Sequence, residues 1–470
     1  MSYTITIVGT GLQGMHILRR IESDPSFHNV SVVTIDPYPE PFHLWYRRTE
    51  NCGMTHLRSP ASHGIHPAFP TIRRFGARRS DSLTAPLFVP PYHRPSLQLF
   101  NEHIRHEAER SDRRRRHITG TVEGVDLGAS TIHLFGTTDH YRHFSVTCDA
   151  TILALGSPPP WVPPCFAAVM TATSRIAHIY DLSFDRSRLA PDGRVAVVGG
   201  GIGAVQLVLH LAHRGFDTTL WNRDPLVPSQ FDSDPCFVGP RCGDAFRRIR
   251  DYRERRRVID AERRPGSVPP DLLAELNDAV AAGRVRLLSG EVHNAQIIPY
   301  RVGEEPPGRS GSALSGAIHA APSVGYPHGE PGIRILLTGS SDRSTVTEAF
   351  DYVIPATGFR REPPANDLVA SIARRNGLAI DDDGYPIPDG ALRWRRSTMP
   401  RDHEGVPGND DRRSSNGHIP PDPAASVPIY LTGALGELEL GPPARNIIGA
   451  HLAGRRIVPD IGRRITDSPR

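Results

Sequence analysis

The sequence of 470 residues contains no lysine, so all 55 of its basic residues are arginine. They are nearly balanced by 51 acidic residues, which leaves a net charge of +4 at pH 7. Arginine clusters occur at residues 113–116 and 247–257. Acidic residues interrupt the second cluster and neither cluster carries an aromatic stacking motif, so we interpret both as solvated surface. We therefore expect no nucleic-acid partner.

Cysteine is also scarce, and the sequence has no Cys-x-x-Cys or Cys-x-x-x-x-Cys pair of the kind that forms a redox dithiol. An odd number of scattered cysteines without an export signal indicates reduced thiols rather than a disulfide framework. We interpret the short spacing between Cys236 and Cys242 as coincidence. The five cysteines are Cys52, Cys148, Cys165, Cys236 and Cys242.

Long apolar runs are missing too: no stretch approaches the roughly 18 consecutive apolar residues that span a bilayer. The chain enters an apolar strand at residues 3–8 without a basic start or a cleavage site, so we expect neither export nor a membrane, but a cytoplasmic protein. Its length exceeds what one compact core holds, which favours two domains or one domain inserted in another.

The first informative motif is Gly9-x-Gly11-x-x-Gly14, which follows an apolar strand and opens a helical pattern. In this context Gly9 permits the tight turn, Gly11 lets the backbone approach a pyrophosphate, and Gly14 allows the helix to pack on the strand. The helix N-terminus stabilises the anion. The next strand ends at Asp36, whose carboxylate can accept both hydroxyls of an adenosine ribose. A dinucleotide site is predicted here.

The same construction returns in the middle of the chain, where a strand runs into Gly199-x-Gly201-x-x-Ala204, with alanine in place of the third glycine. The following strand ends at Arg223 with no acid at the ribose position. A missing carboxylate and a present arginine favour a 2′-phosphate, hence NADPH over NADH. Arg214 is a second candidate for that phosphate, and a surface role for Arg223 is the alternative.

Two further segments match each other: residues 149–156 and 351–358 share Asp, Ile, Ala and Gly at identical offsets. Each is predicted to be a buried strand that ends in a glycine turn, at Gly156 and Gly358, close to a bound cofactor. Each segment also comes about one domain length after a glycine motif, as expected if the chain crosses from one domain to the other there.

These motifs predict an α/β fold with two Rossmann-like dinucleotide-binding domains, the second inserted in the first. We assign FAD to a discontinuous domain of residues 1–187 and 349–470, and NADPH to the inserted domain of residues 189–348. The stretches 303–331 and 399–425 are rich in Gly, Pro, Ser and charge, so they are predicted to be flexible surface excursions.

The two glycine motifs together with Asp351–Phe359 (Asp-x5-Thr-Gly-Phe) resemble the class B flavin monooxygenases, most closely the ornithine and lysine N-hydroxylases. Phe42-x-x-Trp45 and then Met54 are similar to the segment that lines the flavin pocket of that family. Trp221-Asn222-Arg223 is similar to its NADPH phosphate site. Residues 433–456 resemble its last helix, without the Gly-Asp pair of disulfide reductases.

The resemblance implies that NADPH reduces FAD, that O2 adds to the flavin as a C4a-hydroperoxide, and that one oxygen passes to the nitrogen of an amine or amino acid. Siderophore or secondary metabolism is the setting this implies. Pro60 stands where the family has a lysine that holds the substrate, and Arg58 is the candidate to bind a carboxylate in its place. The Baeyer–Villiger fingerprint fails, because only His178 of it is present. The candidate pocket residues are Met54, His56, Arg58 and His63, with Phe231 and Asp232 from the inserted domain.

Two other functions stay open: an NADPH:acceptor oxidoreductase that transfers electrons without inserting oxygen, and a redox sensor or binding protein. His63 and His66 flank a turn without a third ligand, so we predict no metal site. The expected partners are therefore a small amine or amino acid and O2, and a homo-oligomer is left open.

Overall fold

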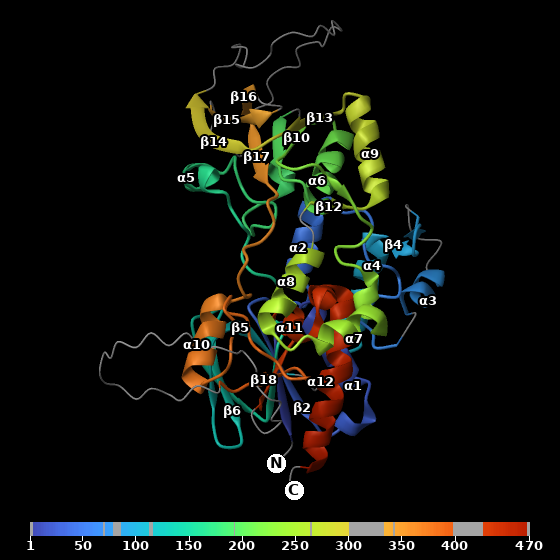
Figure 1. The fold of residues 1–470 in the computed structure, drawn as a ribbon, viewed down its shortest axis with the longest axis vertical. Helices are drawn as coiled ribbons and strands as arrows, with labels where there is room; N and C mark the ends of the chain where they lie inside the picture. Colours follow the sequence, from blue (N-terminus) through green and yellow to red (C-terminus); the bar gives the residue numbers. More distant parts are fainter. Residues whose placement is uncertain are drawn as a thin grey trace, which may run out of the picture.

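The fold is described by a computed structural model (Figure 1). It describes residues 3–68, 71–78, 86–111, 116–191, 193–263, 266–299, 333–341, 344–397 and 426–467. The two predicted surface excursions, 303–331 and 399–425, lie outside the described residues, as does most of the arginine cluster at 113–116. The described part forms two domains, the larger at the bottom of Figure 1 and the smaller at its top.

The larger domain is built on a mixed sheet of eight strands in the order β18-β19-β8-β1-β2-β5-β6-β7. Its centre is parallel and its margins are antiparallel. At the centre of the sheet, β8 is buried throughout and β1 is buried except at Thr4, as expected for parallel strands covered on both faces, whereas β5 alternates between buried and exposed residues. The strands are β1 (Thr4–Val8), β2 (Ser31–Asp36), β5 (Arg116–Leu127), β6 (Ile132–Thr138), β7 (His143–Cys148), β8 (Ala150–Leu153), β18 (Arg393–Arg395) and β19 (Ser426–Leu431).

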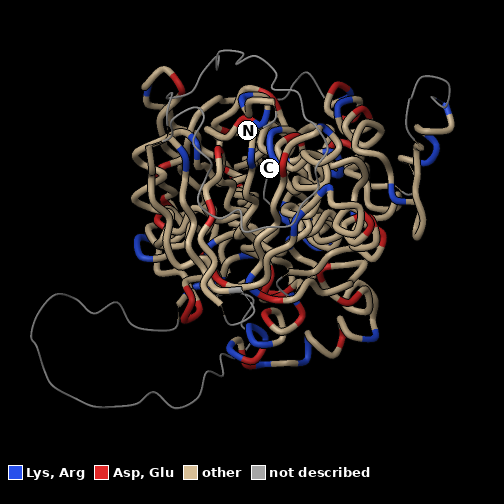
Figure 2. Tube along the Cα trace, turned by 90° about the horizontal axis from the view of Figure 1, so that it is seen from above, with Lys and Arg blue, Asp and Glu red and all other residues tan. Residues whose placement is uncertain are grey.

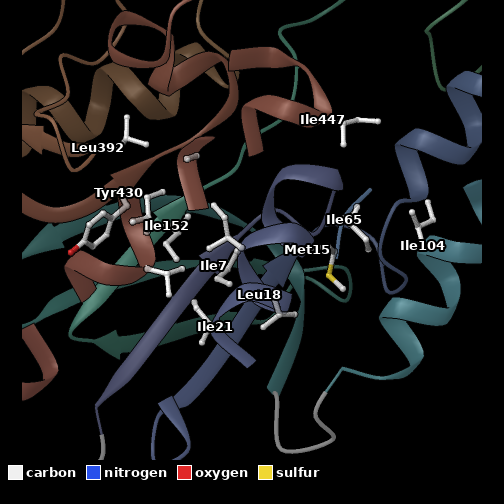
Figure 3. Close-up of a cluster of buried hydrophobic side chains, with 14 of the residues drawn as sticks. Ile7, Met15, Leu18, Ile21, Ile65, Ile104, Ile152, Leu392, Tyr430 and Ile447 are labelled. Atoms are coloured by element: carbon white, nitrogen blue, oxygen red, sulfur yellow. The ribbon is translucent and has the colours of Figure 1, made fainter. Parts of the chain in front are cut away.

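Helices α1 (Leu12–Glu22) and α12 (Ile447–Asp467) pack together over one face of this sheet. Their apolar stripes meet the inward side chains of β1 and β8 in a buried cluster that includes Ile7, Met15 and Ile152 (Figure 3). Helix α10 (Asn366–Asn376) covers β5 on the other face. Around this core lie α2 (His43–Asn51), α3 (Thr71–Ala77), α4 (Leu97–Glu109) and α11 (Glu437–Leu440).

The smaller domain has a parallel sheet of four strands in the order β13-β10-β9-β17. Helices α6 and α9 pack on one face, while α5 and a three-stranded antiparallel sheet pack on the other. Strand β17 lies beyond the predicted domain boundary at residue 348, so the predicted division cuts this sheet. The elements are β9 (Arg194–Val198), β10 (Asp217–Asn222), β13 (Val285–Ser289), β14 (Val292–Pro299), β15 (Ile333–Ser341), β16 (Ser344–Phe350), β17 (Tyr352–Pro355), α5 (Pro164–Ala172), α6 (Ile202–His213) and α9 (Pro270–Ala281).

The two matched segments make the same contact in each domain. The carboxylate of Asp149 accepts a hydrogen bond from the backbone N–H of Thr4, at 2.7 Å, where β1 begins. The carboxylate of Asp351 accepts one from the N–H of Arg194, at 2.9 Å, where β9 begins. Each aspartate therefore fixes the register of its own strand, β8 or β17, against the first strand of a nucleotide unit.

Helices α7 (Pro240–Arg248) and α8 (Tyr252–Glu262) leave the smaller domain between β11 (Val227–Pro228) and β12 (Ser267–Val268). We call this pair the helical arm. It crosses to the larger domain (Figure 1), where α8 lies beside α11 and the turn Pro442–Arg445. Phe246 and Ile259 of the arm pack with Tyr385, Ala434 and Leu438 in a buried apolar cluster.

A buried carboxylate anchors the arm to the larger domain. The side chain of Glu437 is 1% exposed and pairs with Arg256 of the arm and with Arg445, whose Nε lies 2.6 Å away. Burial raises the pKa of Glu437, but the two guanidinium groups outweigh burial and hold the pKa below its ordinary value. Asp381 is a second carboxylate for Arg256, at 3.0 Å.

Acidic and basic residues are interspersed over the described trace (Figure 2). The interpretation of residues 247–257 as solvated surface is nevertheless wrong in part. Arg255 and Arg256 are 7% and 8% exposed and bind carboxylates of the larger domain. Sequence spacing could not predict this, because the partners lie far along the chain. Among the described helices, none is both long enough and apolar enough to cross a membrane.

The expectation that all cysteines are reduced is also wrong. Cys236, in the 3-10 turn Pro235–Val238, and Cys242, in the first part of α7, form a disulfide. The turn folds back before Pro240 and brings the two Cα atoms to 5.2 Å, within the usual range for a disulfide. Cys52, Cys148 and Cys165 are free.

Replacing Glu437 with Gln should leave Arg256 and Arg445 with less compensation for their buried charges. We expect the free energy of unfolding to fall by about 3 kcal/mol, measured by urea denaturation of the full chain. Glu254→Gln is the matched control, since its pair with Arg257 is exposed on both sides and contributes less than about 1 kcal/mol. Equal stability of the two variants would show that Glu437 does not anchor the arm.

Candidate functional site

A cavity of about 1490 Å³ is lined by residues of both domains. From the larger domain it receives the first glycine turn, the end of β2 and α2, and from the smaller domain the start of α6 and the loop before the arm. Pockets for small ligands are usually about 300–1000 Å³, so this cavity is large enough for a long ligand or for two ligands at once.

The first glycine turn has the geometry that its sequence predicts. Gly9 has a φ of +101°, and a Cβ there would overlap the carbonyl oxygen of Ala154. A Cβ at Gly14 would overlap the carbonyl oxygen of Gly9, so α1 can approach β1 closely only with glycine. Gly11, at the start of α1, has no atom within 4 Å of its Cβ position and lines the cavity. The open space at Gly11 leaves the helix N-terminus accessible to an anion.

Asp36 and Trp45 also line the cavity. One carboxylate oxygen of Asp36 accepts the backbone N–H of Thr10 at 2.6 Å, and the other accepts that of Tyr38 at 3.0 Å. Each oxygen keeps a further lone pair for a ribose hydroxyl. The indole N–H of Trp45 donates to the side chain of Asn101 at 2.9 Å, which fixes the ring in the wall.

The second glycine turn repeats this arrangement. Gly199 has a φ of +144°, and a Cβ there would overlap the carbonyl oxygen of Ala356. Gly201 begins α6 with no atom within 4 Å of its Cβ position, and Ala204 is buried behind it. These three residues lie outside the cavity lining, which reaches this helix at Ile202.

Arg223, the predicted phosphate ligand, follows β10 on the surface and is also outside the cavity lining. Its side chain is 63% exposed, and its Nε donates to the carboxylate of Asp224 at 2.9 Å. Sequence reasoning overlooked Asp224 as a partner. An exposed pair of this kind contributes little, so a phosphate can displace the carboxylate at small cost.

The glycine turns that end the matched segments lie at the two crossings between the domains. Gly156 and Gly358 have φ values of +76° and +82°, as predicted for turns that require glycine. The crossings run side by side, because the N–H of Trp161 donates to the carbonyl of Gly358 at 3.0 Å and Pro160 bridges Phe359. Gly156 lines the cavity.

The structure places the three predicted pocket residues Met54, His56 and Arg58 differently. Met54 and Arg58 line the cavity, whereas His56 does not. His56 is half-buried, its backbone pairs with Ser96, and its ring lies 3.0 Å from the carbonyl oxygen of Pro86. The expectation that His56 faces the pocket is corrected.

Arg58 joins the two domains. Its Nε donates to the carbonyl of Gln230 at 2.9 Å, and its Nη2 donates to that of Ser229 at 2.8 Å. Burial lowers the pKa of this guanidinium. Three of its five N–H donors are therefore occupied by oxygens of the protein, two of them backbone carbonyls and one the hydroxyl of Ser267 at 3.2 Å, which departs from the expectation of a free carboxylate ligand.

The other predicted residues of the substrate region line the cavity as expected, with Pro60 beside them. Asp232 accepts a hydrogen bond from the Asn446 amide at 2.9 Å and faces Arg263 at 3.7 Å. The ring of Phe231 lies 5.2 Å from that of Tyr92, so one aromatic group from each domain meets here. Burial lowers the pKa of His63 to about 4.

Sequence reasoning missed Arg48 and Gln206, which line the cavity from opposite domains. Arg48 lies three residues after Trp45, and therefore about one turn further on the same face of α2. This spacing could have predicted that Arg48 lines the same cavity as Trp45. Gln206 is the only polar residue in the first two turns of α6, where an amide stands out among apolar side chains.

No family model and no curated protein matches the sequence. The fold is that of two-domain flavin monooxygenases, so the predicted α/β fold with two Rossmann-like domains is confirmed. One similar structure is the cadaverine monooxygenase DfoA of Erwinia amylovora bound to FAD, with a TM-score of 0.67 and 13% identity over 100% of this chain and 95% of that one.

Two further structures show how widely the fold is shared. The ornithine hydroxylase PvdA of Pseudomonas aeruginosa has a TM-score of 0.66 and 14% identity over 99% of this chain and 100% of its own. The bacillithiol disulfide reductase of Bacillus cereus has a TM-score of 0.55 and 15% identity over the same shares, 99% and 100%. At these identities the likeness establishes the fold alone.

The low pKa of His63 predicts how stability changes with pH. A histidine with a folded pKa of about 4, against its ordinary 6.5, contributes stability that is fully present above about pH 6.5. This contribution is lost as the pH falls from 6.5 towards 4, because the unfolded chain binds the proton first. In His63→Gln we expect a smaller loss of urea-denaturation midpoint between pH 7.5 and pH 5 than in the wild type, and in the exposed control His140→Gln an unchanged loss. An identical loss in all three proteins would contradict the prediction.

Proposed function

We propose that the chain is an FAD- and NADPH-dependent monooxygenase that hydroxylates the nitrogen of an amine or amino acid. The observation that carries this proposal is the shared cavity, which connects one dinucleotide cradle directly to the wall provided by the other nucleotide domain. A reaction between two bound dinucleotides requires such an arrangement.

The residues present fit FAD in the larger domain. The open space at Gly11 would admit its pyrophosphate to the N-terminus of α1, and Asp36 would accept the ribose hydroxyls. Trp45, Met54 and Gly156 line the same cavity. A side chain at position 11 would fill the cradle.

The residues also fit NADPH in the smaller domain. The space at Gly201 opens the N-terminus of α6 to a pyrophosphate, and Arg223 at the end of β10 would hold a 2′-phosphate. No carboxylate stands at the ribose position of β10 itself, although Asp224 follows it. The discrimination against NADH therefore depends on displacing Asp224 from Arg223.

Bound FAD would take a hydride from NADPH and activate O2, and the protein would supply orientation and exclude water. Met54 and Phe231 offer apolar walls that keep water out of the reaction space. Asp232 offers a carboxylate to the amine. The nitrogen must be unprotonated to accept oxygen. The carboxylate of Asp232 by itself favours the ammonium form, and the positive charges of Arg58 and Arg263 near Asp232 oppose this effect.

An NADPH:acceptor oxidoreductase without oxygen insertion is the second candidate, and the Cys236–Cys242 disulfide is the observation that favours it. Pro235 and Val238 of the same turn line the cavity, and a disulfide reductase shares the fold. Neither sulfur belongs to the cavity lining, so direct reduction by a flavin is not supported. We therefore favour the monooxygenase.

The decisive experiment is oxidation of the NADPH-reduced protein by O2, followed by stopped-flow absorbance without substrate. A monooxygenase should accumulate a long-lived species that absorbs in the near ultraviolet and differs from oxidised and reduced FAD. A panel of diamines and amino acids is then assayed for hydroxylamine product and for hydrogen peroxide. Featureless reoxidation, with no hydroxylamine and with rapid reduction of added disulfides or quinones, would replace the monooxygenase with the second candidate.

A side chain placed in either glycine turn should abolish binding of one dinucleotide and leave the other bound. In Gly11→Val the side chain has room within the protein but occupies the space for a pyrophosphate, so we expect a folded, colourless protein. In Gly201→Val we expect full FAD content but loss of NADPH binding, for the same reason at the other helix. FAD content is measured by absorbance and NADPH binding by calorimetry, and each variant is the control for the other. Full flavin content in Gly11→Val would remove FAD from the first motif.

A further inference from the structure

Arg48 and Gln206 are two polar side chains that line the cavity without a partner. Among the described residues, Arg48 has no hydrogen-bond acceptor and no carboxylate, and its Nε is buried. Its one contact of note is the ring of Phe359, whose centroid lies 5.2 Å from Cζ. Gln206 is 5% exposed, and its Oε1 is buried and has no hydrogen-bond donor. Buried polar groups without partners are uncommon and require an explanation.

The two residues lie on helix faces that oppose each other. Cys52 follows Arg48 by one turn at the end of α2, and a Cβ at Gly203 would lie 3.4 Å from its sulfur. Gly203 precedes Gln206 on the same face of α6, since residues three apart are neighbours on a helix. Arg48 from the larger domain and Gln206 from the smaller one therefore face a common space.

Tyr180 extends this space towards the N-terminus of α6. Its ring stacks on that of Phe359, with the centroids 5.0 Å apart and the planes within 4°. Its hydroxyl lies against Gly203 in the first turn of α6, where no side chain would fit. The guanidinium of Arg48, the stacked rings and the first turn of α6 thus follow one another along the wall of the cavity.

The other arginines of the cavity all have acceptors, which makes Arg48 different. Arg445 pairs with Glu437, Arg263 faces Asp232, and Arg360 faces Glu362. Arg58 donates to backbone carbonyls. Burial lowers the pKa of Arg48, and the groups that oppose this effect are Tyr180, Tyr38 and Cys52, which are neutral at pH 7. Arg48 is half-buried and its Nε is buried, and a cation in such a position without an anion is costly, so the compensating charge is expected from a ligand.

We propose that Arg48 and Gln206 form an interdomain site for the nicotinamide half of NADP(H), in which Arg48 donates to the pyrophosphate and Gln206 accepts from a ribose hydroxyl. The inference deepens the proposed function and rests on its assignment of NADPH to the smaller domain. The cavity reaches α6 at Ile202 and Gln206, next to the N-terminus of the helix where a pyrophosphate would bind.

The site has a consequence for coenzyme choice. Arg223 would contact only the 2′-phosphate, which NAD lacks, whereas the pyrophosphate and the nicotinamide ribose are common to both coenzymes. Arg48 should therefore act on both coenzymes equally. Because it belongs to the larger domain, it would also connect the coenzyme to the domain that holds FAD.

The test measures binding, without turnover, on the oxidised and FAD-loaded protein. Dissociation constants for NADP+ and for NAD+ are obtained by calorimetry for the wild type, Arg48→Gln, Arg48→Lys, Gln206→Leu and Arg223→Ala. We expect Arg48→Gln to weaken both coenzymes about tenfold to hundredfold, as for loss of a charged hydrogen bond, with FAD content unchanged. Arg48→Lys should recover part of this loss. Gln206→Leu should weaken both coenzymes several-fold, and Arg223→Ala should weaken NADP+ only.

Arg47→Gln is the matched control, because Arg47 is the neighbouring residue of α2 and donates instead to the carbonyl of Phe184. Its dissociation constants should equal those of the wild type. The inference is overturned if Arg48→Gln binds both coenzymes normally, loses FAD instead, or weakens NADP+ alone, as a 2′-phosphate contact would. A wild type that binds neither coenzyme would instead overturn the proposed function, so the two failures are distinguishable.

Discussion

The buried carboxylate of Glu437 is the contact on which the shape of the cavity depends. It holds Arg256 of the helical arm and Arg445 of the larger domain in one ion network. The arm follows directly on the loop that supplies Phe231, Asp232 and the neighbouring residues of the cavity wall. If the arm detached, one side of the cavity would lose its position, although both Rossmann-like sheets would remain intact.

Such a network suits a protein that must hold two domains in a fixed relation. Removing two charges from water is expensive, and the pairing repays the cost only when the partners are fully placed. Arg58 contributes a second tie that uses carbonyl acceptors of the loop before the arm. Both ties lie next to the cavity, so the distance between the two nucleotide cradles is set close to where the chemistry would occur.

The sequence was informative wherever function depends on local backbone geometry. The turns at Gly9 and Gly199 were predictable, because only glycine fits against the carbonyls of Ala154 and Ala356. The repeated aspartates were visible as a pattern, but their role in fixing strand register emerged only from their bonds to Thr4 and Arg194. The assignment of β17 to the smaller sheet was missed, since the pattern marks the strand but not its neighbours.

Side-chain direction and long-range pairing were beyond the reach of sequence patterns. His56 occupies a plausible position in the chain, yet its ring lies beside the carbonyl oxygen of Pro86 and outside the cavity lining. Cys236 and Cys242 are joined because a 3-10 turn folds between them, which their spacing alone did not indicate.

Arg48 and Arg58 both line the cavity from the larger domain, but they differ in the partners that they find there. Arg58 is satisfied by oxygens of the protein and therefore needs no ligand to explain its burial. Arg48 meets only rings and neutral groups, so its burial costs free energy in the protein alone. That cost is recovered when an anion enters between the domains. Because this chain has arginine and no lysine, residue type cannot tell a structural cation from a ligand-binding one. What distinguishes Arg58 from Arg48 is whether the protein itself supplies hydrogen-bond acceptors.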